Sequence, residues 1–227
     1  MLKRIKSLSL LMVMLSSTAI AQNAIYIEQV GDTSAINVTQ TGNQNRIGSE
    51  QNRFELGGNS QTVNITQTGQ GNVLEGNITN AANYNFNADI TGDTNLVTMN
   101  AGDVASVAGT TQNLTITGST NEVTFNQGTT NSSTNGLLNY TIQGDLNTLT
   151  TNIETDDVIN TVNVVGDSNQ ITTTQNGYAG KNIDMNVTGS TNVINVNQTS
   201  TLNVDTLKLN TTGSGSTINI NQCNSGC

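Results

Sequence analysis

The feature of this 227-residue chain that most constrains its fold is a repeat built around glycine. The fourth residue before each of nine glycines and the fifth residue after it are apolar without exception. Because the inward residues recur with a period of two on each side, and the parity changes across the glycine, each repeat predicts two β-strands joined by a turn. Glycine supplies the positive φ that such a turn needs. From Gly69 onward the spacing is 22 to 26 residues, and the turn glycines are Gly31, Gly42, Gly69, Gly92, Gly118, Gly144, Gly166, Gly189 and Gly213.

Polar residues also keep fixed places in the repeat. The third residue after the glycine is Asn seven times and Ser twice, and Gln stands nine residues after it in six repeats. On the inward face of stacked strands, a carboxamide can donate to a copy of itself on one side and accept from a copy on the other. The alternative is that these residues are ordinary turn residues on a polar surface. The predicted inward amide ladder consists of Gln29, Gln40, Asn45, Gln51, Gln67, Asn72, Asn95, Asn121, Gln127, Asn147, Asn169, Gln175, Asn192, Gln198 and Gln222.

A single strand-turn-strand unit leaves its apolar face uncovered, whereas units stacked on one another bury it. The sequence therefore predicts an all-β fold: a β-solenoid of strand-turn-strand repeats, about 22–26 residues each, with two facing parallel sheets. The chain also contains no Pro, the residue that a central strand does not tolerate. With a strand spacing of about 4.8 Å, about eight coils would form a rod on the order of 40 Å long.

The first residues have the pattern of an export signal, with Lys3, Arg4 and Lys6 before a short apolar run and small residues up to Ala21. The run is too short to span a membrane as a helix. We predict a signal peptide at 1–21, repeats at 22–222 and a short Cys-containing tail at 223–227, and hence a secreted protein that is not embedded in the membrane. Without the signal, four basic residues stand against sixteen acidic ones, a formal charge of −12. Such a charge argues against nucleic acid as a partner and favours solubility before assembly.

Two stretches carry Gln, Gly and Asn at a fixed spacing, QTGNQNRIGSEQ at Gln40–Gln51 and QTGQGN at Gln67–Asn72. This pattern resembles the curlin repeat of the curli subunits of bacterial biofilms, and its recurrence in one frame extends the resemblance from about Ile25 to Gln222. Carried over from the family, the ladder Gln before the turn would be Gln29, Gln40 and Gln67. Later repeats depart from the family pattern and predict a more aliphatic core, with Ile90, Ile116, Ile142, Val164, Val187 and Thr211 in that place.

The resemblance implies a function as well as a fold. Curlin subunits form two-sheet β-solenoids that polymerise end to end into an extracellular functional amyloid. They are exported unfolded through an outer-membrane channel and nucleated by a companion subunit. The expectation is therefore a secreted structural subunit of a curli-like fibre in the biofilm matrix, with a role in cell adhesion. Its partners would be further copies of itself, a nucleator subunit and a secretion channel.

A monomeric β-solenoid adhesin or binding module is the alternative, and it would need caps on its first and last coils. The repeat pattern runs almost to both ends of the predicted mature chain, which favours open edges and polymerisation. Calcium binding by Gly-Asp turns and ice binding by outward Thr pairs are weaker alternatives. The calcium-binding nonapeptide is missing, and other residues interrupt the Thr positions.

Catalytic chemistry has little support in the sequence. The chain has no His, so the usual nucleophile–base pairs are missing, and neither an enzyme activity nor a cofactor or metal site is predicted. Cys223 and Cys227 could close a small disulfide loop, pair with another chain, or remain thiols. Export makes an oxidising compartment the expected setting.

Overall fold

The structure is a computed structural model. It describes residues 23–48, 54–79, 83–92, 94–101, 109–118, 120–128, 136–144, 146–154, 157–166, 168–176, 180–189, 191–199, 205–213 and 215–223. The predicted signal peptide at 1–21 lies outside the described residues, as do Gln51 and Cys227. In the described part of the chain every regular element is a β-strand, and every strand pair is parallel.

The described residues form seventeen strands in two sheets. The nine-stranded sheet contains β1 (Glu28–Val30), β3 (Phe54–Gly57), β5 (Leu74–Thr79), β7 (Val97–Ala101), β9 (Val123–Gln127), β11 (Leu149–Ile153), β13 (Ile171–Asn176), β15 (Val193–Thr199) and β17 (Thr217–Cys223). The eight-stranded sheet contains β2 (Ala35–Thr41), β4 (Thr62–Thr68), β6 (Asn85–Thr91), β8 (Thr110–Thr117), β10 (Gly136–Gln143), β12 (Val158–Val165), β14 (Asn182–Thr188) and β16 (Thr206–Thr212).

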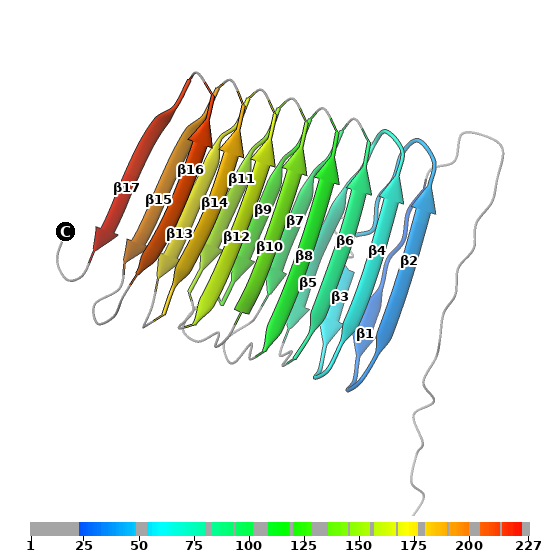
Figure 1. Ribbon diagram of the computed structural model, residues 1–227. Helices are drawn as coiled ribbons and strands as arrows, with labels where there is room; N and C mark the ends of the chain where they lie inside the picture. The colour runs from blue at the N-terminus through cyan, green and yellow to red at the C-terminus, as the bar shows by residue number, and fades with distance from the viewer. Residues whose placement is uncertain are drawn as a thin grey trace, which may run out of the picture.

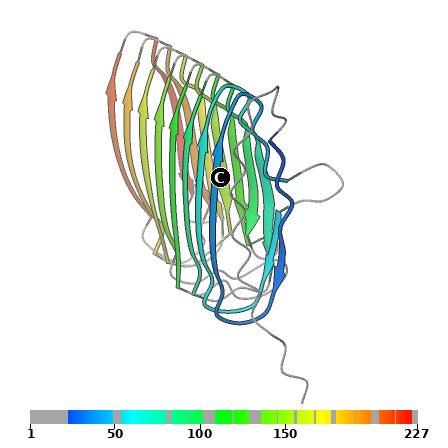
Figure 2. The ribbon, with the colours of Figure 1, turned by 90° about the vertical axis from the view of Figure 1, so that its right-hand side faces the viewer.

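The chain passes from one sheet to the other at every turn, so each strand pairs with the strand two further along (Figure 1). Figure 2 looks at the stack from the end that carries β1 and β2 and shows the two sheets face to face. This arrangement confirms the predicted β-solenoid with two facing parallel sheets. Equivalent Asn residues in neighbouring coils lie 22 to 27 residues apart, slightly beyond the predicted range. The extra residues fall outside the paired strands, because in-register pairing keeps equivalent positions in line.

The core fills the space between the sheets, since inward and outward side chains alternate along each strand. One inward column of the eight-stranded sheet shows its composition: Val38, Ile65, Ala88, Leu114, Tyr140, Val162, Met185 and Leu209. In the middle of the stack the rings of Phe125 and Tyr140 pack against each other at a tilt of 49°, with centroids 5.9 Å apart. Each fully buried aliphatic side chain contributes about 1.5–3 kcal/mol, so the apolar columns supply the main force that stacks the coils.

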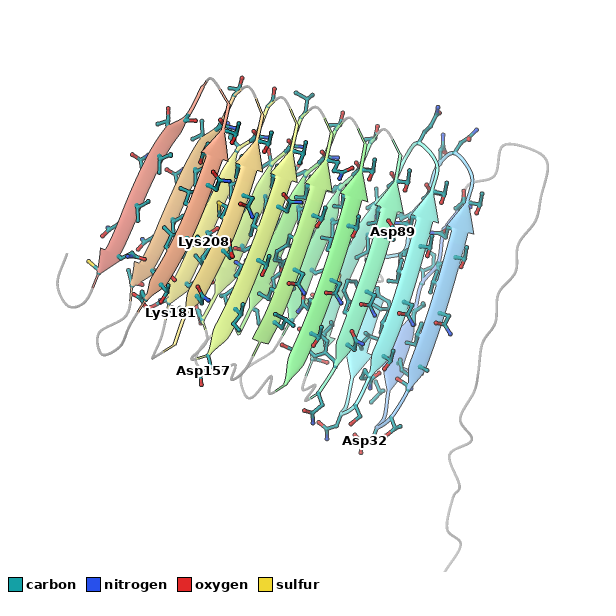
Figure 3. The ribbon with its side chains drawn as sticks, in the orientation of Figure 1. Asp32, Asp89, Asp157, Lys181 and Lys208 are labelled. Carbon is teal, nitrogen blue, oxygen red and sulfur yellow. The ribbon has the colours of Figure 1, made fainter. Side chains whose placement is uncertain are left out.

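One assignment made from the sequence frame is wrong. Gly42 stacks on Gly69, and the residues before it pair with the strand before Gly69. Gly31 instead follows β1 and donates to the carbonyl of Gly57, so it belongs to the turns on the opposite side of the stack. Figure 3 shows Asp32, the residue after Gly31, at the lower edge of the stack in that view. The two halves of a coil carry similar patterns, and therefore Gly31 fits the sequence frame although it stands only 11 residues, about half a period, before Gly42.

Candidate functional site

A continuous ladder of Asn side chains follows one turn of the coils. Its members are buried and stand three residues after a turn glycine: Asn45, Asn72, Asn95, Asn121, Asn147, Asn169 and Asn192. From Asn72 onward, each Nδ2 donates to Oδ1 of the Asn one coil earlier over 2.5–2.6 Å. From Asn45 to Asn169, Nδ2 also donates to the carbonyl of its own turn glycine over 2.8–3.2 Å. One amide thus links two coils and closes its own turn.

The chemistry of this column favours an amide over its closest isosteres. A buried polar group without a partner costs about 1–3 kcal/mol, and Asn avoids this cost by donating and accepting along the same axis. Asp residues along the column would lack the donor and would set like charges one strand spacing apart, about 4.8 Å. The column therefore forms a continuous chain of hydrogen bonds to which each coil adds one amide.

The ladder has different groups at its two ends. At the C-terminal end, Ser216 Oγ donates to Asn192 Oδ1 over 3.0 Å. At the other end, Ile25 donates its backbone N–H to Arg46 O, as Ile47 does to Val73 O one coil later, so Asn23 falls in the Asn column. Asn23 Oδ1 is buried without a hydrogen-bond partner. The sequence frame missed Asn23 because no turn glycine stands three residues before it.

Eight of the predicted turn glycines line the same turn, and we call them the glycine rim: Gly42, Gly69, Gly92, Gly118, Gly144, Gly166, Gly189 and Gly213. From Gly69 onward, a Cβ on any of them would lie 1.4–1.6 Å from the carbonyl oxygen of the glycine one coil earlier. Positive φ, the reason expected from the sequence, holds only at some of them, such as Gly42 at +153° and Gly144 at +155°. The shared reason is the close approach of the neighbouring backbone.

The Gln residues form shorter ladders that run in the opposite direction. Gln40 Nε2 donates to Gln67 Oε1 over 2.8 Å in the eight-stranded sheet. In the other sheet Gln175 donates to Gln198 and Gln198 to Gln222, again over 2.8 Å. The Gln amides thus donate toward the C-terminal end of the stack, whereas the Asn amides donate toward its N-terminal end.

Of the predicted ladder residues, Gln29 lies in a different column, Gln51 lies outside the described residues, and Gln127 lies inward without a ladder neighbour. Gln29 is aligned with Leu56, in the nine-stranded sheet rather than in the column of Gln40. Leu56 also takes the slot that the frame assigned to Gln51, which lies outside the described residues. Gln127 stands between Ala101 and Ile153, so no amide occupies the equivalent position of either neighbouring coil. The Gln column is therefore interrupted where the Asn column is continuous.

Amide ladders also line the outer faces, where none was predicted. On the eight-stranded sheet, bonds of 2.7–3.0 Å join Asn37, Asn64, Asn87, Asn113 and Asn139. On the other sheet, bonds of 2.9–3.0 Å join Asn77, Asn100 and Asn126. The sequence signal was available, because the first five Asn stand five residues before the first five rim glycines. The outward Thr positions are less regular, since Asp89 interrupts the column of Thr66 and Thr115.

A buried ion pair lies on the turn opposite the glycine rim. Lys181 Nζ is 3.3 Å from Asp205 Oδ1, and the two side chains are 0% and 7% exposed. An outward pair, Lys208 with Asp184 at 3.1 Å, joins the same two coils in solvent. Figure 3 shows Lys181 and Lys208 near the strands of the C-terminal end. Sequence reasoning missed the buried pair, because 24 residues separate its members.

Two buried tyrosines keep their protons unusually firmly. Burial raises the pKa of the Tyr84 hydroxyl well above its usual value, although a hydrogen bond from Gln112 opposes the shift. Burial, with a smaller effect of Tyr84, also raises the pKa of Tyr140. Both groups are therefore neutral in the core at physiological pH.

The remaining candidates from the sequence are only partly described. Cys223 is disulfide-bonded, and Cys227 lies outside the described residues. Of the Gly-Asp turns, Asp32 is described, whereas Asp93, Asp145 and Asp167 are not. Among the described residues, no three His, Cys, Asp or Glu side chains gather as a metal site would require. No helix in the described ranges has the length and hydropathy of a membrane span.

Comparison of the chain with protein-family models, with curated proteins and with solved structures finds no match. The site is therefore characterised by its own geometry. It consists of amide ladders that run along a stack whose edge strands are β1 and β17 in one sheet and β2 and β16 in the other. Such edges present backbone N–H and C=O groups that can pair with a further strand.

Proposed function

We propose that this chain is a secreted structural subunit that assembles head to tail into curli-like amyloid fibres of an extracellular or biofilm matrix, with a role in adhesion. The observation that carries the proposal is the state of the last coil. Ile218 and Ile220 of β17 point inward yet are 43% and 48% exposed, beside edge strands whose outer side no described strand covers. A soluble monomer normally protects such edges.

The mechanism that fits these ends is templated strand addition. An incoming chain pairs its backbone with an edge strand and covers the open apolar columns. It also extends the Asn ladder: the first Asn that is added meets the Ser216 hydroxyl, and each later Asn donates to the amide below it. The formal charge of −12 that follows signal removal keeps unassembled chains apart.

The wider setting rests on the curlin resemblance and on the predicted signal at 1–21. In that setting the subunit leaves the cell through an outer-membrane channel, and a nucleator subunit starts its fibres. The working residues are the amide ladder and the glycine rim, and no residue acts as a catalyst.

The proposal is tested with the mature chain, 22–227, diluted from denaturant at neutral pH and examined by electron microscopy and fibre diffraction. We expect unbranched fibres with a meridional reflection near 4.7 Å and an equatorial one near 10 Å. Sonicated fibres should abolish the lag phase of fresh protein, because their ends act as templates. A stable, monodisperse, β-rich monomer would contradict the proposal and favour the monomeric adhesin.

A further inference from the structure

The two sheets contain unequal numbers of described strands, nine and eight. Among the described residues the stack begins with β1 and ends with β17, and both belong to the nine-stranded sheet. If two copies meet head to tail with every strand in place, β1 of one copy follows β17 of the other. The eight-stranded sheets are then separated by an empty strand position between β16 and the next β2. Continuous pairing of both sheets requires β1 and β17 to occupy one position.

The inward faces of these two strands are equivalent. The register carries the column of Gln29 through the whole nine-stranded sheet to Gln222. By the same register, Ile27 shares a column with Ile220. Ile25 likewise shares one with Ile218. Each end of the stack therefore presents Ile, Ile and Gln in the same three inward places.

We infer that, at a head-to-tail junction, β17 of one copy displaces β1 of the next and takes its position. The inference rests on the proposed assembly and specifies its junction. Ile218 and Ile220 then lie over Ile47 and Phe54 of the next copy, which Ile25 and Ile27 cover in the free molecule. In the other sheet β16 pairs directly with β2, so no strand position is left empty.

The strand that gives way is the weaker of the two. β1 pairs over three residues, whereas β17 pairs over seven. Val30 and Tyr26 at this end are 74% and 55% exposed. Glu28 also lies directly beside Glu55 on the outer face, and like charges in neighbouring strands repel. In the column of Glu28, β17 carries Asn221, which removes this repulsion.

The glycine rim is completed by the same exchange. In the free molecule, the Asn23 side chain lies beside Gly42, with its Oδ1 2.7 Å from the Cβ position. In the other coils, the carbonyl of the preceding rim glycine lies against that position. When the segment 23–30 leaves, Gly213 of the preceding copy can stack on Gly42, and Ser216 takes the place of Asn23 in the Asn column.

The axial repeat of the fibre tests the inference on the full mature chain. Displacement predicts about 38 Å per subunit, eight strand spacings, whereas retention of both strands predicts about 43 Å, nine spacings. Helical reconstruction from cryo-electron micrographs distinguishes the two values. A repeat near 43 Å would overturn the inference and leave the proposed function intact, and a chain that forms no fibres would overturn both.

Matched variants in the two strands provide a second test. The double variant Ile218→Asn and Ile220→Asn should slow seeded elongation by at least about tenfold, because these side chains become buried at the junction. The double variant Ile25→Asn and Ile27→Asn alters the same columns in β1 and should elongate at least as fast as the parent chain. Equal slowing by both pairs would show that β1 stays in the junction and would overturn the inference.

Discussion

At the scale of single residues, a parallel stack places most side chains beside their equivalents in the next coil. Side chains that bond to their own kind are then favoured, which explains the Asn ladder, while charged ones are disfavoured unless an opposite charge is present. Lys181 illustrates the second case. Its side chain is fully buried, and the carboxylate of Asp205 lies beside it in the next coil. The same logic makes glycine necessary where neighbouring backbones almost touch.

The buried and exposed ladders should differ in strength. Asn72→Ala removes the donor to Asn45 and the acceptor of Asn95, both buried, and should lower the free energy of unfolding by about 2–3 kcal/mol. Asn64→Ala, in the same coil, breaks two equally regular but exposed bonds. Water replaces these bonds, so the expected loss is below about 1 kcal/mol. Urea denaturation measures both, and equal losses would contradict a special role of the inner column.

Close approach, rather than φ, should determine which glycines tolerate substitution. Gly166→Ala places a Cβ 1.6 Å from the carbonyl oxygen of Gly144 and should destabilise the fold by at least about 3 kcal/mol. Gly57→Ala meets nothing nearer than 3.5 Å and should change stability by less than about 1 kcal/mol. Neither glycine has a φ in the left-handed range, so the comparison isolates sterics. Similar unfolding midpoints for the two variants would refute this explanation.

At the scale of the strand, the stability of an inward column depends on how well each side chain matches its neighbours in the adjacent coils. Asn160 of β12 is fully buried between Leu138 and Ile183, and neither its Nδ2 nor its Oδ1 has a partner. Gln112 lies in the same column two coils earlier and donates to the hydroxyl of Tyr84. The two amides therefore make opposite contributions to the stability of their strands.

Substitution by Leu should reveal this difference in sign. Asn160→Leu replaces an unpaired amide with a side chain of similar size and should raise the free energy of unfolding by about 1–3 kcal/mol. Gln112→Leu removes the hydrogen bond from the amide to the buried Tyr84 hydroxyl and should lower the free energy of unfolding by about 1–2 kcal/mol. Thermal and urea unfolding of the two variants provide the measurement. A loss of stability in Asn160→Leu would show that the amide is paired in solution.

At the scale of the whole molecule, the dry interior should make the stack sensitive to alkali. Tyr84 and Tyr140 have a raised pKa when folded, whereas an unfolded tyrosine loses its proton near pH 10. Above that pH the unfolded chain binds fewer protons than the folded one, so stability falls as pH rises. Each tyrosine should contribute a slope of up to about 1.4 kcal/mol per pH unit.

Urea midpoints of freshly diluted protein, measured before fibres form, would show this dependence between pH 9 and pH 11, about one pH unit on either side of the free tyrosine value. Tyr140→Phe should reduce the alkaline slope, whereas Tyr26→Phe, which alters an exposed ring, should leave it unchanged. A slope that survives Tyr140→Phe undiminished would place the titrating groups elsewhere.

The local pattern was sufficient for the fold class and for much of the inner ladder. Apolar residues with a period of two, the parity change at each glycine and the regular Asn three residues later are set by strands and turns themselves. The inward places of Asn72, Asn121 and Asn169 follow directly from them. The outward Asn ladders follow from the same counting, at five residues before the glycine in one sheet and eight residues after it in the other.

Long-range register decided the rest. The two halves of a coil have similar sequence patterns, so only the pairing of β1 with β3 shows that Gly31 lies opposite the glycine rim. Register likewise places Leu56 in the slot assigned to Gln51 and aligns Asp205 with Lys181. The sequence by itself determined the repeating strand, turn and ladder, because these depend on neighbours a few residues apart. Only the tertiary structure decided which residues of neighbouring coils lie side by side, because backbone hydrogen bonds between strands more than twenty residues apart set that alignment.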